Sequence, residues 1–180
     1  MGFGRSVARG ATFSGVLALL VVGAADAQVQ NAAQQGCINA LNKSGQKVAA
    51  TQGKDISACI KDAGLSKLVG MNAEECLTAD RKGKVTSATG KTTDGQTKKC
   101  TEAPSFGFTG APIVNDAGVQ QEIGLVHDIF KNPITTAISV DPTRAKCQSG
   151  VSKSYEKYAA TVLKEFNSCK KTGLKDGTID

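Results

Sequence analysis

The sequence contains no tryptophan and only six phenylalanines and two tyrosines among its 180 residues. A large aromatic core is therefore excluded, and the core must consist mainly of valine, isoleucine, leucine and alanine. Few aromatic residues also argue against stacking on the bases of single-stranded nucleic acid, so no specific nucleic-acid partner is expected. Small cores of this kind are commonly reinforced by covalent cross-links.

Motifs that mark cofactor, metal or catalytic sites are also missing. The six cysteines include no C-x-x-C pair, and no two of them lie two to four residues apart. This spacing argues against thioredoxin-like redox chemistry, c-type haem attachment and a compact zinc site. Glycine-rich nucleotide loops and the G-x-S-x-G and H-E-x-x-H motifs are absent as well. We therefore expect no cofactor, no metal and no enzymatic activity.

His127 is the single histidine, and an enzyme of this sequence would have to be built around it. A catalytic histidine needs a nucleophile and an orienting group, and a metal-binding histidine needs a further ligand at helical spacing. The sequence indicates neither, so a surface or half-buried helical histidine is favoured. Loss of a measured reaction in a His127→Ala variant would instead favour the alternative, a small enzyme.

Residues 1–27 have the features of a secretory signal peptide. Arg5 and Arg9 precede the apolar run ATFSGVLALLVVGA, and Ala25-Asp26-Ala27 forms an A-x-A cleavage site. That run is too short to span a bilayer as a mature helix, and no later segment is apolar enough. We therefore expect a secreted or periplasmic protein with no transmembrane segment after signal removal. All six cysteines follow the cleavage site, which in an exported chain predicts a disulfide framework.

The mature chain contains an internal repeat. Residues 37–59 align without a gap with residues 147–169, and nine of the 23 positions are identical, both cysteines included. Both segments carry apolar residues on one face at helical spacing. Asp141-Pro142 predicts the start of the second helix, while Gly64 and Gly173 predict the two helix ends.

A degenerate third copy is predicted between Cys76 and Cys100, beginning at a capping box of Asn72 and Glu75. Gly90 and the Thr93-Asp94-Gly95 turn are expected to interrupt this helix. Residues 101–114 contain two prolines and are expected to form a loop. A further helix is predicted over residues 116–131.

The cysteine spacing restricts the disulfide pairing. Two residues 22 positions apart on one straight helix are separated by roughly 33 Å, whereas a disulfide needs Cα atoms within about 7 Å. Cys37 therefore cannot pair with Cys59 on a continuous helix. An antiparallel partner helix would place Cys59 beside Cys76 near the turn and Cys37 beside Cys100 at the open end.

Cys147 and Cys169 have no partner under this pairing. One hypothesis is that the chain is a fragment, cut before a second partner helix that would carry two more cysteines. The rival interpretation is a complete protein with another pairing or with two free thiols.

Lysines repeat together with the cysteines, and we call the repeated set the basic ridge. Its members lie to one side of the cysteine direction, away from the apolar arc, so they are expected to face solvent. Such a row of lysines either binds an anionic partner or simply keeps the helices soluble. The basic ridge consists of Lys43, Lys47, Lys54, Lys61, Lys153, Lys157, Lys164 and Lys171.

These observations predict an all-α, disulfide-stapled antiparallel helical hairpin repeat of about one and a half copies, with a loop and short helices between. The predicted organisation is a signal peptide (1–27), a first hairpin (28–104), a linker with a helix near 116–131 (105–140) and the start of a second copy (141–180). The leading function is a non-enzymatic structural or interaction module. The alternative is a carrier or binder of anionic envelope polymers or lipids.

The segments KKCTEAPSFGFTGAPIVNDAGVQQEIGLVHDIF and AKCQSGVSKSYEKYAATVLKEFNSCKKTGLKDGTID resemble a group of uncharacterised exported bacterial proteins. Those proteins are similar in their long lysine-rich helices with widely spaced cysteine pairs, and they are often longer than this chain. The resemblance implies no activity.

Overall fold

The computed structural model describes residues 29–179, and all regular structure in that range is helical. The predicted signal peptide, residues 1–27, lies outside the described residues. The elements are α1 (Ala32–Gly64), α2 (Ala73–Cys76), α3 (Lys84–Lys99), α4 (Gly110–Phe130), the 3-10 helix η1 (Ile134–Thr136) and α5 (Pro142–Asp176). The predicted all-α class is confirmed. None of these helices is apolar enough over a sufficient length to cross a membrane.

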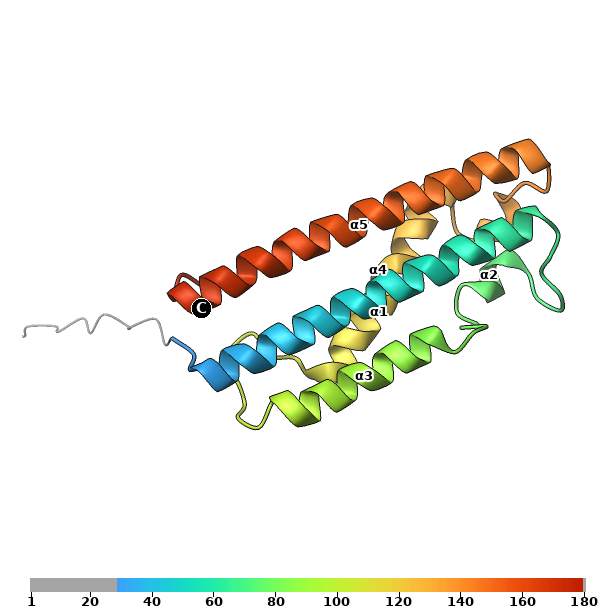
Figure 1. Ribbon diagram of the computed structural model, residues 1–180. Helices are drawn as coiled ribbons and strands as arrows, with labels where there is room; N and C mark the ends of the chain where they lie inside the picture. The colour runs from blue at the N-terminus through green and yellow to red at the C-terminus, as the bar shows by residue number, and fades with distance from the viewer. Residues whose placement is uncertain (1–28, 180) are drawn as a thin grey trace, which may run out of the picture.

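Helix α1 is the element that the other helices share, because it contacts α2, α3, α4 and α5. Figure 1 shows α1 between α3 and α5, which both run antiparallel to it, while α4 crosses it obliquely. Small residues on α1 allow close approach. A Cβ atom at Gly45 would lie 2.6 Å from the side chain of Val114 in α4, and one at Gly53 would lie 3.0 Å from the side chains of Glu122 and Glu156.

Two disulfides join α1 to the segment that follows it. Cys59 pairs with Cys76 at the end of α2, and Cys37 pairs with Cys100 directly after α3. These are the pairs that the cysteine spacing predicts. The bridges close loops of 17 and 63 residues, which in the chain-entropy model stabilises the fold by about 3 and about 4 kcal/mol.

The apolar core has two parts, one near each disulfide. The larger cluster surrounds Cys59–Cys76 and includes Ile56, Val126 and Ile134 from three different elements. The smaller one surrounds Cys37 with Leu41 and Ala111, and Cys100 and Val114 pack against it. Beside the larger cluster, α1 and α5 also meet through a polar contact, the buried 2.8 Å hydrogen bond between the hydroxyls of Ser57 and Ser152.

Two predicted caps are present, but the first begins a helix of only four residues that ends at Cys76 and not the helix that reaches Cys100. Asn72 and Glu75 form the expected capping box of α2, and Asp141 accepts a hydrogen bond from the backbone N–H of Arg144 at the start of α5. Helix α1 ends at Gly64, as predicted. The expected end of α5 at Gly173 is wrong. The helix continues to Asp176, and Gly177 follows it with a φ of 66°, a left-handed conformation that glycine adopts easily.

The predicted interruption of the helix before Cys100 is wrong. Helix α3 runs from Lys84 to Lys99 without a break at Gly90 or Gly95. Its packing against α1 buries Thr92 completely, and tertiary contacts of this kind override weak helix propensity. The stretch between Cys76 and α3 is instead a turn, in which the Asp80 carboxylate accepts hydrogen bonds from the N–H groups of Val85 and Thr86.

Helix α4 begins at Gly110, within the segment that we expected to be a loop. The side-chain oxygen of Gln96 in α3 accepts a hydrogen bond from the N–H of Ala111, which satisfies one of the free donors in the first turn. Pro112 is tolerated there because no intrahelical hydrogen bond needs its missing N–H.

The two repeat segments are packed differently. On α1, the positions that carry the repeated apolar face are all buried: Cys37, Leu41, Gly45, Val48, Gln52, Ile56 and Cys59. At the equivalent positions of α5 only Tyr155 is buried, and the others are exposed: Cys147, Val151, Tyr158, Val162, Phe166 and Cys169. Helix α5 therefore packs on α1 through a different face from the one that the repeat pattern indicates.

Contact between α1 and α5 at Gly64 gives a test of this packing. A Cβ at Gly64 would lie 2.5 Å from the Cβ of Ala145 and 3.2 Å from the carbonyl oxygen of Ser139. We expect Gly64→Ala to lower the free energy of unfolding by about 1–3 kcal/mol through overpacking. Urea denaturation followed by circular dichroism measures this loss.

Gly124→Ala is the matched control, because a Cβ at Gly124 in α4 meets nothing within 4 Å. The control should gain up to about 1 kcal/mol from helix propensity. Equal shifts in the two variants would contradict the proposed close contact.

Candidate functional site

The basic ridge is exposed along its whole length. All eight of its lysines face solvent, four on α1 and four on α5. Because these two helices pack side by side and run antiparallel (Figure 1), the two rows of lysines run in opposite directions along neighbouring helices. The two rows meet at Lys61 and Lys153, which line one cavity, whereas Lys47 and Lys54 lie on the side of α1 that faces α3.

A groove between α1 and the beginning of α3 collects lysines from both elements. Its cavity volume is about 700 Å³, and we call it the lysine groove. The lysines that line it come from the ridge and from the segment before and within α3: Lys47, Lys54, Lys82, Lys84 and Lys91.

Small side chains explain why this surface is hollow. Ala50 and Thr51 on α1 face Ser87 and Ala88 on α3 across the lysine groove. These short side chains leave space between the two helices, and the longer lysine side chains surround that space. The Asp80 cap described above fixes the first turn of α3 and with it the backbone of Lys82 and Lys84.

A second cavity lies between the end of α1 and the beginning of α5. Its volume is about 500 Å³, and Lys61, Lys146 and Lys153 line it. The remaining lining includes Leu65, Pro142 and Ala145, so this cavity is more apolar than the lysine groove.

The lysines of both cavities are free of carboxylate partners. Among residues 29–179 the ion pairs within 4.0 Å are Arg81–Asp62 and His127–Glu74, each at 2.8 Å. No lysine of the basic ridge or of the lysine groove takes part in either. These lysines are therefore not held in direct ion pairs, although the charge of Lys82 still acts on the carboxylate of Asp55.

The structure places half of the predicted ridge in the two cavities. Lys47 and Lys54 line the lysine groove, and Lys61 and Lys153 line the second cavity. The other ridge members, Lys43, Lys157, Lys164 and Lys171, line neither.

Sequence reasoning did not assign Lys82, Lys84, Lys91 and Lys146 to the basic surface. One signal was present: Lys82 follows Cys76 by the same six positions by which Lys43 follows Cys37. The degenerate third copy therefore indicated one lysine of the lysine groove, Lys82.

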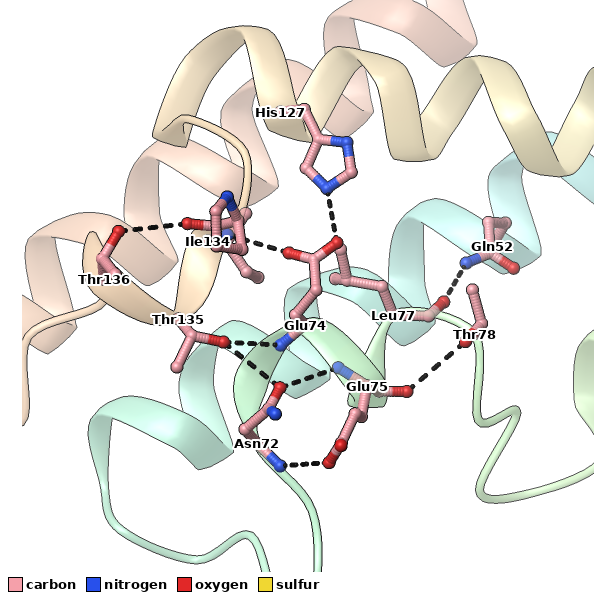
Figure 2. Close-up of polar contacts among 11 residues, drawn as sticks. Gln52, Asn72, Glu74, Glu75, Leu77, Thr78, His127, Ile134, Thr135 and Thr136 are labelled. Atoms are coloured by element: carbon pink, nitrogen blue, oxygen red, sulfur yellow. Dashed lines mark hydrogen bonds and ion pairs between the residues drawn. The ribbon is translucent and has the colours of Figure 1, made fainter.

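His127 joins three elements rather than facing a cavity (Figure 2). Its Nε2 atom lies 2.8 Å from Oε1 of Glu74, and Oε2 of the same carboxylate accepts a 2.8 Å hydrogen bond from the N–H of Ile134. The N–H of Glu74 in turn donates to the hydroxyl of Thr135. One glutamate thus ties α4, through His127, to α2 and η1.

This arrangement connects three elements of the fold by hydrogen bonds. Among residues 29–179, the side chain that forms a hydrogen bond with His127 is that of Glu74. Groups of three or more histidine, cysteine or acidic residues that could hold a metal ion are absent from the same range. Glu74 is a partner that sequence reasoning missed, because 53 positions separate it from His127.

A buried carboxyl group lies where α1, α4 and α5 meet. Glu122 of α4 is 7% exposed, and its Oε2 atom has no hydrogen-bond partner. Burial raises the pKa of Glu122 to about 7, and the nearby charge of Glu156 adds to this effect. Burial also raises the pKa of the adjacent Tyr155 to about 12. Glu122 therefore binds a proton in the folded protein up to near-neutral pH.

Comparison with known proteins gives no match to a family model, to a curated protein or to a solved structure. The functional argument therefore depends on the residues of this chain.

Titration of Glu122 predicts how stability depends on pH. Its pKa in the folded protein is about 7, above the ordinary 4.5, so folding favours the protonated form. Stability should fall as the pH rises from about 4.5 to about 7, because the unfolded chain loses this proton first. Glu122→Gln should therefore raise the melting temperature at pH 8 and have little effect at pH 4.5.

Differential scanning fluorimetry between pH 4 and pH 9 measures this effect. Glu165→Gln, at an exposed position of α5, removes the same charge and serves as the control. Identical pH profiles for wild type and Glu122→Gln would contradict the assignment.

Proposed function

We propose that this protein is an exported, non-enzymatic binding module whose lysine surface binds an extended anionic polymer. The observation that carries the proposal is the set of exposed lysines without carboxylate partners, from α1, α3 and α5, around the lysine groove and along the basic ridge. A surface of one charge sign concentrates ligands of the opposite sign and accelerates their association.

The extent of the ridge favours a polymer over a small anion. Lys43 and Lys61 are 18 positions apart on α1, and at 1.5 Å per residue their backbones are roughly 27 Å apart. A compact anion could contact the lysines of one groove only. A chain with repeated negative charges, such as an acidic envelope polysaccharide, could contact lysines along the whole helix.

Two further features support this function over the alternatives. The two disulfides fit an oxidising compartment outside the cytoplasm, where anionic envelope polymers occur. The enzyme alternative has less support, because His127 is engaged by Glu74 in an arrangement that connects three elements of the fold. The repeat of residues 37–59 and 147–169 also supports the idea that this surface arose when one helical hairpin unit was duplicated. Such a duplication would have doubled a row of lysines.

Retention on immobilised heparin, a sulfated polysaccharide, tests the proposal. The mature protein should bind at low salt and elute as ionic strength rises, because salt screens exposed charges. The triple variant Lys47→Gln, Lys54→Gln, Lys91→Gln should bind about 100-fold more weakly, since each lysine near an anionic surface contributes about 1 kcal/mol. Titration of heparin at fixed salt measures the dissociation constants.

The control is the triple variant Lys67→Gln, Lys98→Gln, Lys99→Gln, which removes the same charge from exposed lysines outside the groove. A control loss as large as that of the groove variant would show that only net charge matters. No retention of the wild type at low salt would end the proposal.

A further inference from the structure

The exposed repeat positions of α5 form an apolar row, interrupted at the buried Tyr155, with a free thiol at each end. We call this surface the cysteine face, and it consists of Cys147, Val151, Tyr158, Val162, Phe166 and Cys169. Cys147 and Cys169 are free and exposed, while Tyr158 is 71% and Phe166 61% exposed. Large apolar side chains are seldom grouped in this way on a surface that stays in water.

The equivalent face of α1 shows what such a pattern can bind. There the two cysteines, again 22 positions apart, form disulfides to an antiparallel segment, α2 and α3. Helix α4 also packs on this face, against Leu41, Gly45 and Val48. On α5 no described residue of the chain covers that face, so the same pattern of cysteine, apolar residues and cysteine has no partner segment there.

The residue spacing keeps both thiols on one side of the helix. From Cys147 to Cys169 the repeat positions follow steps of 4, 4 and 3 residues, twice over. Eleven residues in three turns gives about 3.67 residues per turn, close to the 3.6 of a straight α-helix. The two thiols cannot meet within α5, since roughly 33 Å of helix separates them, but both can meet a second straight helix.

We propose that the cysteine face binds the cysteine face of a second copy of this chain, antiparallel and related by a twofold axis, with two disulfides between Cys147 of one copy and Cys169 of the other. Tyr158 lies midway between the two cysteines in the sequence, so a twofold axis at Tyr158 brings each Cys147 opposite a Cys169. Identical spacing on the two helices makes both bridges form in one register, as in any isologous contact.

Charge selects the antiparallel orientation over the parallel one. Arg144 lies one turn before Cys147, and Asp176 lies near the other end of α5; both are exposed. Antiparallel pairing places Arg144 of each copy near Asp176 of the other. Parallel pairing would instead place Arg144 beside Arg144 of the other copy and Asp176 beside Asp176. It would also align the two helix dipoles unfavourably.

Formation of the bridges needs an oxidant. For each bridge, the two thiols lose two protons and two electrons and form one S–S bond. A disulfide-containing oxidant accepts the electrons and protons by thiol–disulfide exchange and is reduced to two thiols. Two molecules of oxidant are therefore reduced for each dimer.

The proposed contact leaves the lysines of α5 free. Lys153, Lys157 and Lys164 lie on a different side of the helix from the cysteine face at about 100° per residue, so dimer formation and heparin binding can be measured separately.

Oxidation of the mature protein tests the proposal directly. The purified chain, with its two internal disulfides intact, is incubated with a mixture of reduced and oxidised glutathione, then analysed by non-reducing electrophoresis and by mass spectrometry of proteolytic peptides. We expect a covalent dimer in which the peptide with Cys147 is linked to the peptide with Cys169. Cys147→Ser and Cys169→Ser should each form no covalent dimer alone, whereas a mixture of the two variants should form a heterodimer with one bridge.

Surface variants separate the apolar contact from thiol chemistry. Tyr158→Ser should reduce the rate of dimer formation at least tenfold, whereas Val140→Ser, at an exposed apolar residue outside the face, should leave it unchanged. Three results would overturn the proposal: bridges between identical cysteines, covalent dimers of either single variant alone, or a monomer that carries only glutathione on its thiols.

Discussion

The fold depends on the burial of α1 on several sides at once. Buried residues of this helix face α3, α4 and α5, and small or polar members such as Gly53 and Ser57 are among them. A helix with four glycines and a weakly apolar sequence is marginal by itself. Its stability must come from the helices around it, and their arrangement is in turn determined by the shape of α1.

The disulfides compensate for a core that is thin in its middle. Apolar clusters lie towards the two ends of α1, each beside one bridge, while Gly45, Gly53 and the buried carboxyl of Glu122 lie between them. Cross-links at both ends hold α2 and α3 in place without a large apolar area. Helix α5, in contrast, has no covalent link to α1 among the described residues.

Sequence reasoning was most successful where geometry leaves few alternatives. The length of a straight helix excludes a bridge from Cys37 to Cys59, and the capping residues Asn72 and Asp141 mark their helix starts by local hydrogen bonds. It failed where tertiary packing decides, as in the continuity of α3 through Gly90 and the early start of α4 at Gly110. Three further features depend on contacts between distant segments, which sequence periodicity does not report. They are the face through which α5 packs, the lysine groove between α1 and α3, and the pairing of His127 with Glu74.

The central claim is that α1 is the element on which the other helices depend. Native-state hydrogen exchange tests it most directly, because exchange in the most stable element requires global unfolding. The account predicts the slowest exchange in the second half of α1, between Val48 and Ile60, with faster exchange in the second half of α5. Slower exchange in α5 than in α1, or equal exchange in α1 and α3, would contradict it.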